Sequence, residues 1–248
     1  MKTVLITGAS SGIGKVIAEY LCERGYRVYG TSRAKHREPG IKSREGGSFE
    51  LLQLDVTNDD SVAGLMQYLA TNRIDIDVLI NNAGYGLAGP LENFSMDEAK
   101  AQFETNFFGV VRMINAFLPV LRARGGGVII NTGSMAGLIG LPFQGHYSAS
   151  KYALEGYLAA LRMEVLPFNI HVFNINPGDF RTGFTANRRI ISTVHPIYQR
   201  KFDQLLKMYE HDENNGAYPV VIARKVEKLL RKNRSEEHTS ELQSRGLI

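Results

Sequence analysis

Hydrophobic and polar positions alternate along the chain with two different periods. Short β-branched apolar runs, such as KTVLIT, are followed by longer segments whose apolar residues recur every three or four positions. Continuous apolar runs are typical of parallel strands buried on both faces. The strands predicted in this way are Thr3–Thr7, Arg27–Gly30, Glu50–Leu54, Val78–Asn81, Val128–Asn131 and His171–Ile175. The repeated strand–helix order predicts a single α/β domain in three layers, a mostly parallel sheet with helices on both faces.

The first strand-to-helix junction is rich in glycine. Gly8, Gly12 and Gly14 lie in the segment TGASSGIG, after which Ile17, Ala18 and Leu21 follow a helical period. Glycine lets a backbone approach a phosphate, and a helix N-terminus offers free N–H groups and the positive end of its dipole. The junction therefore predicts a dinucleotide site, with a turn that serves packing alone as the alternative.

The end of the second strand indicates which dinucleotide binds. Ser32 and Arg33 stand where NAD-binding folds usually place a carboxylate for the ribose 2′-hydroxyl. A guanidinium would instead attract a 2′-phosphate, which favours NADP(H) over NAD(H). The alternative is a solvated arginine within the basic run RAKHR. Asp55, after the third strand, is expected to contact the adenine amine; the alternative is that it caps the following helix, and both roles could coexist.

Tyr147 and Lys151 lie four residues apart in a predicted helix, HYSASKYALEGYLAALRMEV. Residues at this spacing share one helix face, and a nearby ammonium favours a phenolate and lowers the pKa of a tyrosine. The pair is thus interpreted as a general acid/base, against the alternative of a half-buried tyrosine beside a snorkelling lysine. His146 points about 100° away around the helix and is interpreted as a rim or surface residue.

Several motifs occur in one order along the chain: the glycine turn, NNAG, TNFFGVV, NTGSMAG, the tyrosine–lysine pair and INPGDFRT. Together they resemble the short-chain dehydrogenase/reductase family over residues 2–233, and most closely its hydroxysteroid and retinol dehydrogenases. The resemblance implies a Rossmann-type doubly wound parallel sheet and an oxidoreductase that interconverts an alcohol and its carbonyl. The catalytic residues that it implies are Ser134, Tyr147, Lys151 and Asn106.

The resemblance also implies a role for each of these residues. Tyr147 exchanges a proton with the substrate oxygen, Ser134 positions that oxygen, and Lys151 lowers the tyrosine pKa and binds the nicotinamide ribose. Asn106 holds a relay water, or alternatively bonds the backbone at a helix irregularity. A lipophilic substrate of steroid, retinoid or lipid kind is expected. The predicted cofactor residues are Gly8, Ser10, Ser11, Gly12, Ile13, Gly14, Ser32, Arg33, Asp55, Val56, Asn82, Ala83, Gly84, Tyr147, Lys151, Pro177, Gly178 and Thr182.

Composition excludes other classes of function. The net charge of +4 and the short basic runs without interleaved aromatic residues argue against a nucleic-acid surface. Six scattered histidines and one cysteine, Cys22, show no zinc spacing and exclude an internal disulfide. The lone cysteine agrees with a reducing, cytoplasmic compartment, and no signal peptide or membrane-spanning apolar run is present. The resemblance adds the expectation of a homodimer or homotetramer.

The C-terminal third carries two further expectations. Aromatic residues and methionines in residues 180–219 suggest a lid over an apolar substrate, and the alternative is a plain amphipathic helix from Pro196 to Glu210. The segment RSEEHTSELQS, Arg234–Ser244, resembles the translation of a sequencing adapter. We therefore expect one domain over 1–233, a non-native tail over 234–248, and no final edge strand beside His171–Ile175.

Other functions remain open at this stage. A sugar-nucleotide epimerase or dehydratase has a different glycine spacing and a larger C-terminal region. A regulator that binds NADPH without turnover typically lacks the tyrosine or the lysine. The third alternative is a truncated, inactive member of the family.

Overall fold

A seven-stranded sheet organises the computed structural model, which describes residues 1–35, 40–182 and 188–232. The strand order is β3-β4-β2-β1-β5-β7-β8, and every pairing is parallel except that of β3 with β4. Its strands are β1 (Thr3–Ile6), β2 (Arg27–Ser32), β3 (Ile41–Lys42), β4 (Ser48–Gln53), β5 (Val78–Asn81), β7 (Gly127–Thr132) and β8 (Ile170–Ile175).

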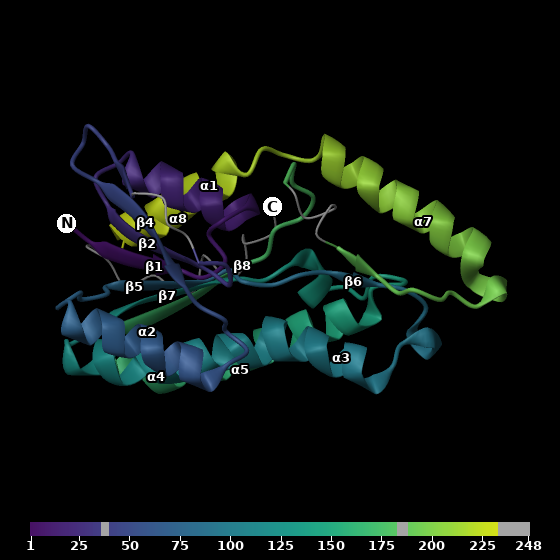
Figure 1. Ribbon diagram of the computed structural model, residues 1–248, viewed down its shortest axis with the longest axis horizontal. Coiled ribbons are helices and arrows are strands. Elements are labelled where there is room, and N and C mark those ends of the chain that lie inside the picture. The colour runs from purple at the N-terminus through teal and green to yellow at the C-terminus, as the bar shows by residue number, and fades with distance from the viewer. Residues whose placement is uncertain (36–39, 183–187, 233–248) are drawn as a thin grey trace.

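Helices cover both faces of this sheet. Figure 1 shows α1 and α8 on one side and α2, α4 and α5 on the other. Their bounds are α1 (Gly12–Cys22), α2 (Asp59–Thr71), α3 (Met96–Phe103), α4 (Gly109–Ala123), α5 (Gly145–Val165), α7 (Pro196–Asn215) and α8 (Val220–Lys232). Shorter turns are η1 (Leu91–Asn93), the π-helical η2 (Glu104–Phe108), η3 (Met135–Gly137) and η4 (Leu166–Phe168). The predicted three-layer, doubly wound α/β fold is confirmed.

Each central strand contributes to both cores. Leu5 of β1 packs in the core with α2, α4 and α5, whereas Val4 and Ile6 pack in the core with α1 and α8. All three side chains are fully buried. This two-sided burial is the physical reason that the strands are continuous apolar runs rather than alternating ones. Cys22 is buried at the end of α1, as expected for a small core residue.

The predicted strands are all present, and β8 forms one edge of the sheet. Within residues 1–35, 40–182 and 188–232, β8 pairs with β7 alone, and the uncovered edge stays a prediction. The expected tail, 234–248, lies outside the described residues. None of the helices in the described ranges is both long and apolar enough to cross a membrane.

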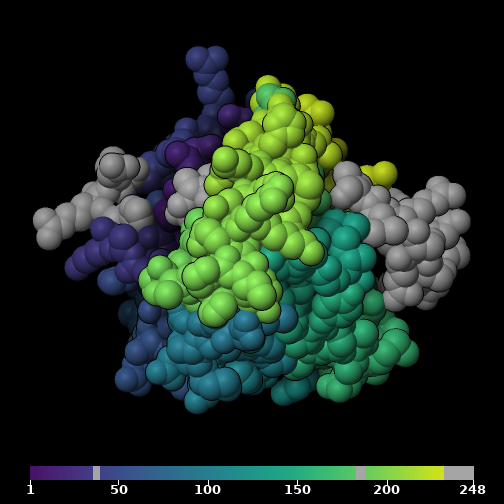
Figure 2. Space-filling view, turned by 90° about the vertical axis from the view of Figure 1, so that its right-hand side faces the viewer, coloured from purple at the N-terminus to yellow at the C-terminus, as the bar shows by residue number. Residues whose placement is uncertain are grey.

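Helix α7 projects beyond the sheet and crosses the face of the molecule seen in Figure 2. It follows the short strand β9 (Arg189–Ile190), which pairs in parallel with β6 (Leu87–Ala88). The Tyr209 hydroxyl of α7 donates a hydrogen bond to the carbonyl oxygen of Pro142 at 3.1 Å. The ring of Phe202 packs edge-on against Phe143. Helix α7 is therefore fastened to the loop that leads into α5, and it extends five residues beyond the predicted Glu210.

Candidate active site

The carboxyl ends of β1 and β5 are joined by side-chain hydrogen bonds. The Thr7 hydroxyl oxygen accepts from the backbone N–H groups of Asn82, at 2.9 Å, and Ala83, at 3.0 Å. The Asn82 amide donates to the carbonyl oxygens of Thr7 and Gly8, each at 3.0 Å. The predicted NNAG segment is thus fixed directly against the predicted glycine turn.

The structure shows why two positions of this turn are occupied by glycine. An added Cβ at Gly14 would lie 2.4 Å from the Gly8 carbonyl oxygen and 2.4 Å from the Asn82 amide nitrogen. Gly12 has a φ of +58°, and among the described atoms an added Cβ there meets nothing within 4 Å. The turn therefore combines close backbone packing on one side with open space on the other.

The start of α1 fits a pyrophosphate. Ser11 is the N-cap, and within the described structure its side chain makes no capping hydrogen bond. The first N–H groups of α1 therefore face the open side of the turn, where they would hold a negatively charged group. Ser10 and Ser11 are exposed there, while Ile13 is half-buried and packs against the core.

The predicted adenosine residues lie at the ends of β2 and β4. Ser32 is buried, its hydroxyl oxygen accepts from the backbone N–H of Ala34 at 3.1 Å, and Arg33 beside it is exposed. The Asp55 carboxylate accepts two hydrogen bonds from Thr57, at 2.9 and 2.7 Å. Val56 is buried in the core and lies against Gly109.

The alternative role of Asp55 as a helix cap is wrong. Helix α2 begins at Asp59, and its N-cap is Asn58, whose side-chain oxygen accepts from the Ser61 N–H at 2.8 Å. Asp55 lies one turn too early to reach these N–H groups and stabilises the preceding loop instead. Its contact with the adenine amine stays a prediction.

Asn106 lies in the π-helical turn between α3 and α4, where the expected helix irregularity is found. Its side-chain oxygen accepts from the Tyr85 N–H at 3.1 Å, and its amide donates to the Tyr85 carbonyl at 3.0 Å. The amide also lies 3.3 Å from the Ser150 hydroxyl of α5. Asn106 therefore fixes the backbone of Tyr85, just after Gly84. An added Cβ at Gly84 would lie 3.1 Å from the Asn106 side-chain oxygen. Its role with a relay water stays a prediction.

Tyr147 is buried on the first turns of α5 and shares a hydrogen bond with Ser134. Burial raises the pKa of its hydroxyl to about 12, and the hydrogen bond from Ser134 opposes this rise. Among charged groups, the Glu213 carboxylate raises the pKa of Tyr147 and the Arg188 guanidinium lowers it. The expectation of a pKa below that of a free tyrosine is therefore wrong for the protein by itself, because desolvation outweighs the cationic neighbours.

Lys151 lies one turn further along α5 and is also buried. Its ammonium donates to the Thr132 carbonyl oxygen at 2.7 Å and lies 5.9 Å from the centroid of the Tyr147 ring. Burial lowers the pKa of Lys151 to about 8, although the Glu155 carboxylate opposes this shift. The structure thus brings Ser134, Tyr147 and Lys151 together as predicted, and burial shifts the pKa values of both Tyr147 and Lys151 toward the neutral form.

A polar network that the sequence analysis missed positions Ser134. The Ser134 backbone N–H donates to the Asn176 side-chain oxygen at 3.1 Å. The amides of Asn174 and Asn176 both donate to one carboxylate oxygen of Glu155, each at 2.6 Å. The signal in the sequence was an acidic residue four positions after Lys151, on the same helix face.

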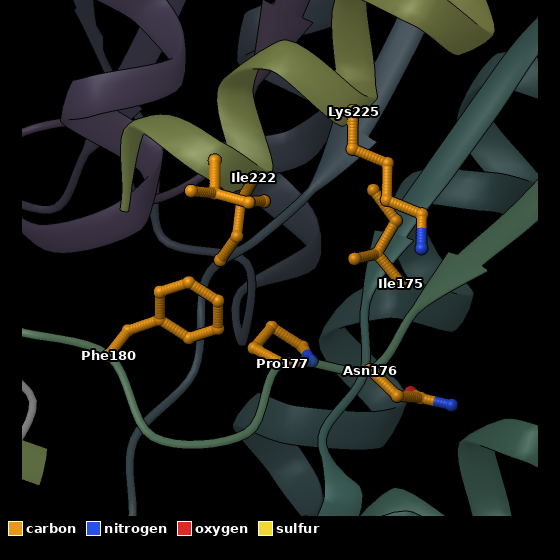
Figure 3. A pocket seen from close by; sticks show the side chains of 7 residues that line it. Ile175, Asn176, Pro177, Phe180, Ile222 and Lys225 are labelled. Atoms are coloured by element: carbon orange, nitrogen blue, oxygen red, sulfur yellow. The ribbon is translucent and has the colours of Figure 1, made fainter. Parts of the chain in front are cut away.

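The segment after β8 is supported from behind by α8. Pro177 is buried, and its carbonyl oxygen accepts from the Met135 N–H at 3.0 Å. Figure 3 shows Pro177, Phe180 and Ile222 around a small apolar pocket, with the Asn176 side chain directed away from it. Gly178 is exposed and Thr182 is half-buried. The predicted nicotinamide segment is thus held by a backbone hydrogen bond at Pro177, and its contacts with the cofactor stay predictions.

A buried ion pair lies over Tyr147 and has no counterpart in the sequence analysis. The Arg188 side chain is 1% exposed and pairs with Glu213 of α7, which is 13% exposed. The guanidinium carbon lies 6.0 Å from the centroid of the Tyr209 ring. No motif connects two charged residues that lie 25 positions apart.

His146 is half-buried against Phe94, with their ring centroids 5.0 Å apart, in agreement with a position at the rim.

Comparison with known proteins agrees with this geometry. The family model described as short chain dehydrogenase matches residues 2–190. The chain is 46% identical over 233 residues to a 3-ketodihydrosphingosine reductase of Bacteroides thetaiotaomicron, covering 93% of this chain and 84% of that protein. It is 40% identical to the human 17-beta-hydroxysteroid dehydrogenase type 1, covering 79% of this chain and 65% of that protein.

A solved structure shares the fold as well. An alcohol dehydrogenase from the archaeon Thermococcus sibiricus, complexed with 5-hydroxy-NADP, superposes with a TM-score of 0.72 at 27% identity. The match covers 93% of this chain and 91% of that one. With the glycine turn, the serine–tyrosine–lysine cluster and these relatives in agreement, the chain belongs to the short-chain dehydrogenase family.

Proposed function

We propose that the protein is an NADP(H)-dependent oxidoreductase that interconverts a lipophilic ketone and its alcohol. The observation that carries this proposal is the cluster of the half-buried Ser134 with the buried Tyr147 and Lys151. Ser134 follows β7 and the glycine turn follows β1; because β1, β5 and β7 are parallel, both lie at the carboxyl edge of the sheet. Chemistry on a carbonyl needs both a bound dinucleotide and a proton donor of this kind.

In the reductive direction NADPH, when bound, would supply the hydride that the carbonyl carbon receives. The Tyr147 hydroxyl gives its proton to the carbonyl oxygen, and the Ser134 hydroxyl donates a hydrogen bond that stabilises the growing negative charge. The raised pKa of Tyr147 keeps this hydroxyl protonated near neutral pH, which is the form that donates the proton in reduction. Lys151 would bind the nicotinamide ribose, and Asn106 would hold a water that connects Lys151 with solvent.

A long-chain amino ketone is the first substrate to test. The relative from Bacteroides thetaiotaomicron is described as a 3-ketodihydrosphingosine reductase and matches nearly the whole chain. The aromatic side chains of Phe143, Tyr198 and Phe202 pack between α7 and the loop before α5. Such an apolar wall suits a hydrocarbon chain, which also fits the expected lipid-like substrate.

The preference for NADPH rests on Arg33, which is exposed at the end of β2. A fluorescence titration with NADPH and NADH tests it in the wild type, in Arg33→Ala and in the matched control Arg44→Ala, which removes an exposed arginine elsewhere. A lost charge-assisted hydrogen bond should weaken NADPH binding by about tenfold to hundredfold. NADH binding should change little, and equal affinities of the wild type for both cofactors would contradict the preference.

Turnover is tested separately, by NADPH oxidation with 3-ketodihydrosphingosine and with steroid and retinoid carbonyls. The proposal expects activity with at least one of these ketones and its loss in Tyr147→Phe, which keeps the ring but removes the proton. Tight NADPH binding without oxidation on any carbonyl would instead support a cofactor-binding regulator.

A further inference from the structure

A half-buried carboxylate that the mechanism does not use lies on α5 beyond the tyrosine–lysine pair. Tyr147, Lys151 and Glu155 follow one another at intervals of four residues and therefore share one face of the helix. This face is turned toward the sheet, because the Lys151 ammonium donates to the Thr132 carbonyl oxygen of β7. Glu155 continues the same row of contacts onto the next strand, β8.

One oxygen of Glu155 accepts from two side-chain amides. The Nδ2 groups of Asn174, in β8, and of Asn176, just after it, each donate to this oxygen at 2.6 Å. The Oδ1 atom of Asn176 in turn accepts from the backbone N–H of Ser134 at 3.1 Å. A carboxylate only accepts and a backbone N–H only donates. The Asn176 amide can therefore bond to both groups in one orientation alone, and Glu155 selects that orientation.

The Ser134 N–H is the middle one of three successive backbone donors that connect this segment with the end of β8. The Gly133 N–H donates to the Ile175 carbonyl oxygen at 2.7 Å. The Met135 N–H donates to the Pro177 carbonyl oxygen at 3.0 Å. These two outer bonds join backbone to backbone, whereas the middle bond ends on a side chain. The backbone position of Ser134 thus depends on how that side-chain amide is oriented.

The two amides pack directly against the backbone before Ser134. An added Cβ at Gly133 would overlap the Asn176 Oδ1 atom and would lie 2.7 Å from the Asn174 Nδ2 atom. A change in the orientation of the Asn176 amide would therefore displace the peptide that carries Ser134. The Ser134 hydroxyl shares a hydrogen bond with Tyr147, so a small displacement of this peptide acts at the reacting group.

We propose that Glu155 is a positioning residue for Ser134: its carboxylate orients the Asn176 amide, and the oriented amide fixes the Ser134 backbone. The inference rests on the function proposed above for the catalytic role of Ser134. Two alternatives make different predictions. A carboxylate that only joined α5 to β8 would change stability without changing kcat of the folded protein. A carboxylate that acted by its charge on Lys151 would be lost equally in every neutral variant.

The first measurement requires no turnover. It is the hydrogen exchange of the Ser134 backbone amide, followed by NMR in protein labelled with ¹⁵N-serine and assigned by its absence in Ser134→Ala. We expect exchange about tenfold faster than in the wild type in Glu155→Met and in Asn176→Ala. Asn174→Ala removes the other bond to the same oxygen, and Glu164→Met removes an exposed carboxylate of α5. In these two controls the exchange rate should stay near that of the wild type.

The second measurement is kcat for NADPH oxidation, with whichever of the carbonyl compounds named above the wild type reduces fastest. Glu155→Met should lower kcat by about tenfold to hundredfold. Glu155→Gln keeps an acceptor oxygen without the charge and should lower kcat by less than about fivefold. In a Ser134→Ala background, Glu155→Met should change kcat by less than about twofold, because the hydroxyl that it positions is gone. Equal losses in Glu155→Gln and Glu155→Met would assign the effect to charge, and equal losses with and without the Ser134 hydroxyl would also overturn the inference.

The function and the inference fail in distinguishable ways. A wild type that reduces no carbonyl compound contradicts the function, and the exchange rates still decide whether Glu155 fixes the Ser134 backbone. An unchanged Ser134 exchange rate in Glu155→Met overturns the inference whether or not a ketone is reduced. The NADPH affinity of each variant verifies that it is folded. If Glu155→Met does not fold, equal exchange rates in Asn176→Ala and Asn174→Ala overturn the inference instead.

Discussion

The buried ammonium of Lys151 makes the stability of the protein depend on pH in a predictable direction. Burial lowers its pKa from the ordinary 10.5 to about 8, and in the unfolded chain the value returns to its ordinary range. Between these two values the folded protein has released the proton and the unfolded chain still holds it. The free energy of unfolding therefore rises with pH through this window. Below about pH 8 the folded protein carries the buried charge, and its stability is lowered by the full cost of that charge.

A Lys151→Met variant removes this effect while keeping a side chain of similar length. A pKa shift of this size means that the buried charge destabilises the folded protein by about 3 kcal/mol at pH 7. The variant has no buried charge and avoids this cost, but it loses the hydrogen bond to the Thr132 carbonyl, which contributes about 1 to 2 kcal/mol. At pH 7 we therefore expect an inactive variant that is more stable than the wild type by about 1 to 2 kcal/mol.

The assay is urea denaturation of both proteins without cofactor, at pH 7 and at pH 9.5. The wild type should gain about 2 kcal/mol relative to Lys151→Met between these pH values, with unchanged denaturant slopes. Lys15→Met, which removes a half-exposed lysine of α1, is the control for the loss of a surface charge. The reasoning would be refuted if the free energies of unfolding of the wild type and Lys151→Met differed by the same amount at both pH values.

Two further substitutions test the geometry of the site. Gly14→Ala places a methyl group 2.4 Å from a backbone oxygen and should weaken NADPH binding by about tenfold or more, as measured by fluorescence titration. Its control is Gly64→Ala on α2, where among the described atoms an added Cβ meets nothing within 4 Å, and which should stabilise the protein by up to about 1 kcal/mol in urea denaturation. Ser134→Ala should lower kcat by about 10²- to 10³-fold and move the alkaline limb of its pH profile upward, because Ser134 lowers the pKa of Tyr147. A kcat within about twofold of the wild type would exclude the role of Ser134.

The sequence was most informative where a local pattern determines the structure. An apolar run such as Val4–Ile6 is a strand buried on both faces, and a spacing of four residues places Tyr147 and Lys151 on one face of α5. The six main strands could therefore be predicted. The strands of two residues, β3, β6 and β9, carry no detectable period and were not predicted.

The sequence was least informative where distant segments meet. The cap of α2 is Asn58 rather than Asp55, because the helix begins at Asp59, beyond the reach of the Asp55 side chain. The direction of the Tyr147 pKa shift follows from burial, which depends on the whole tertiary structure. Arg188 and Glu213 come from segments that a sequence pattern cannot place together.

The acidity of Tyr147 depends in part on the Arg188–Glu213 pair, which couples the pH profile of the site to this ion pair. Glu213 raises the pKa of Tyr147, so Glu213→Gln should lower it. Reduction needs the protonated hydroxyl, and the alkaline limb of kcat for a neutral ketone should accordingly move to lower pH. Arg188 acts in the opposite sense, and Arg188→Met should move the same limb to higher pH. A pair that only fastened α7 would change the rate or the melting temperature without moving the limb, and unmoved limbs in both folded variants would contradict this coupling.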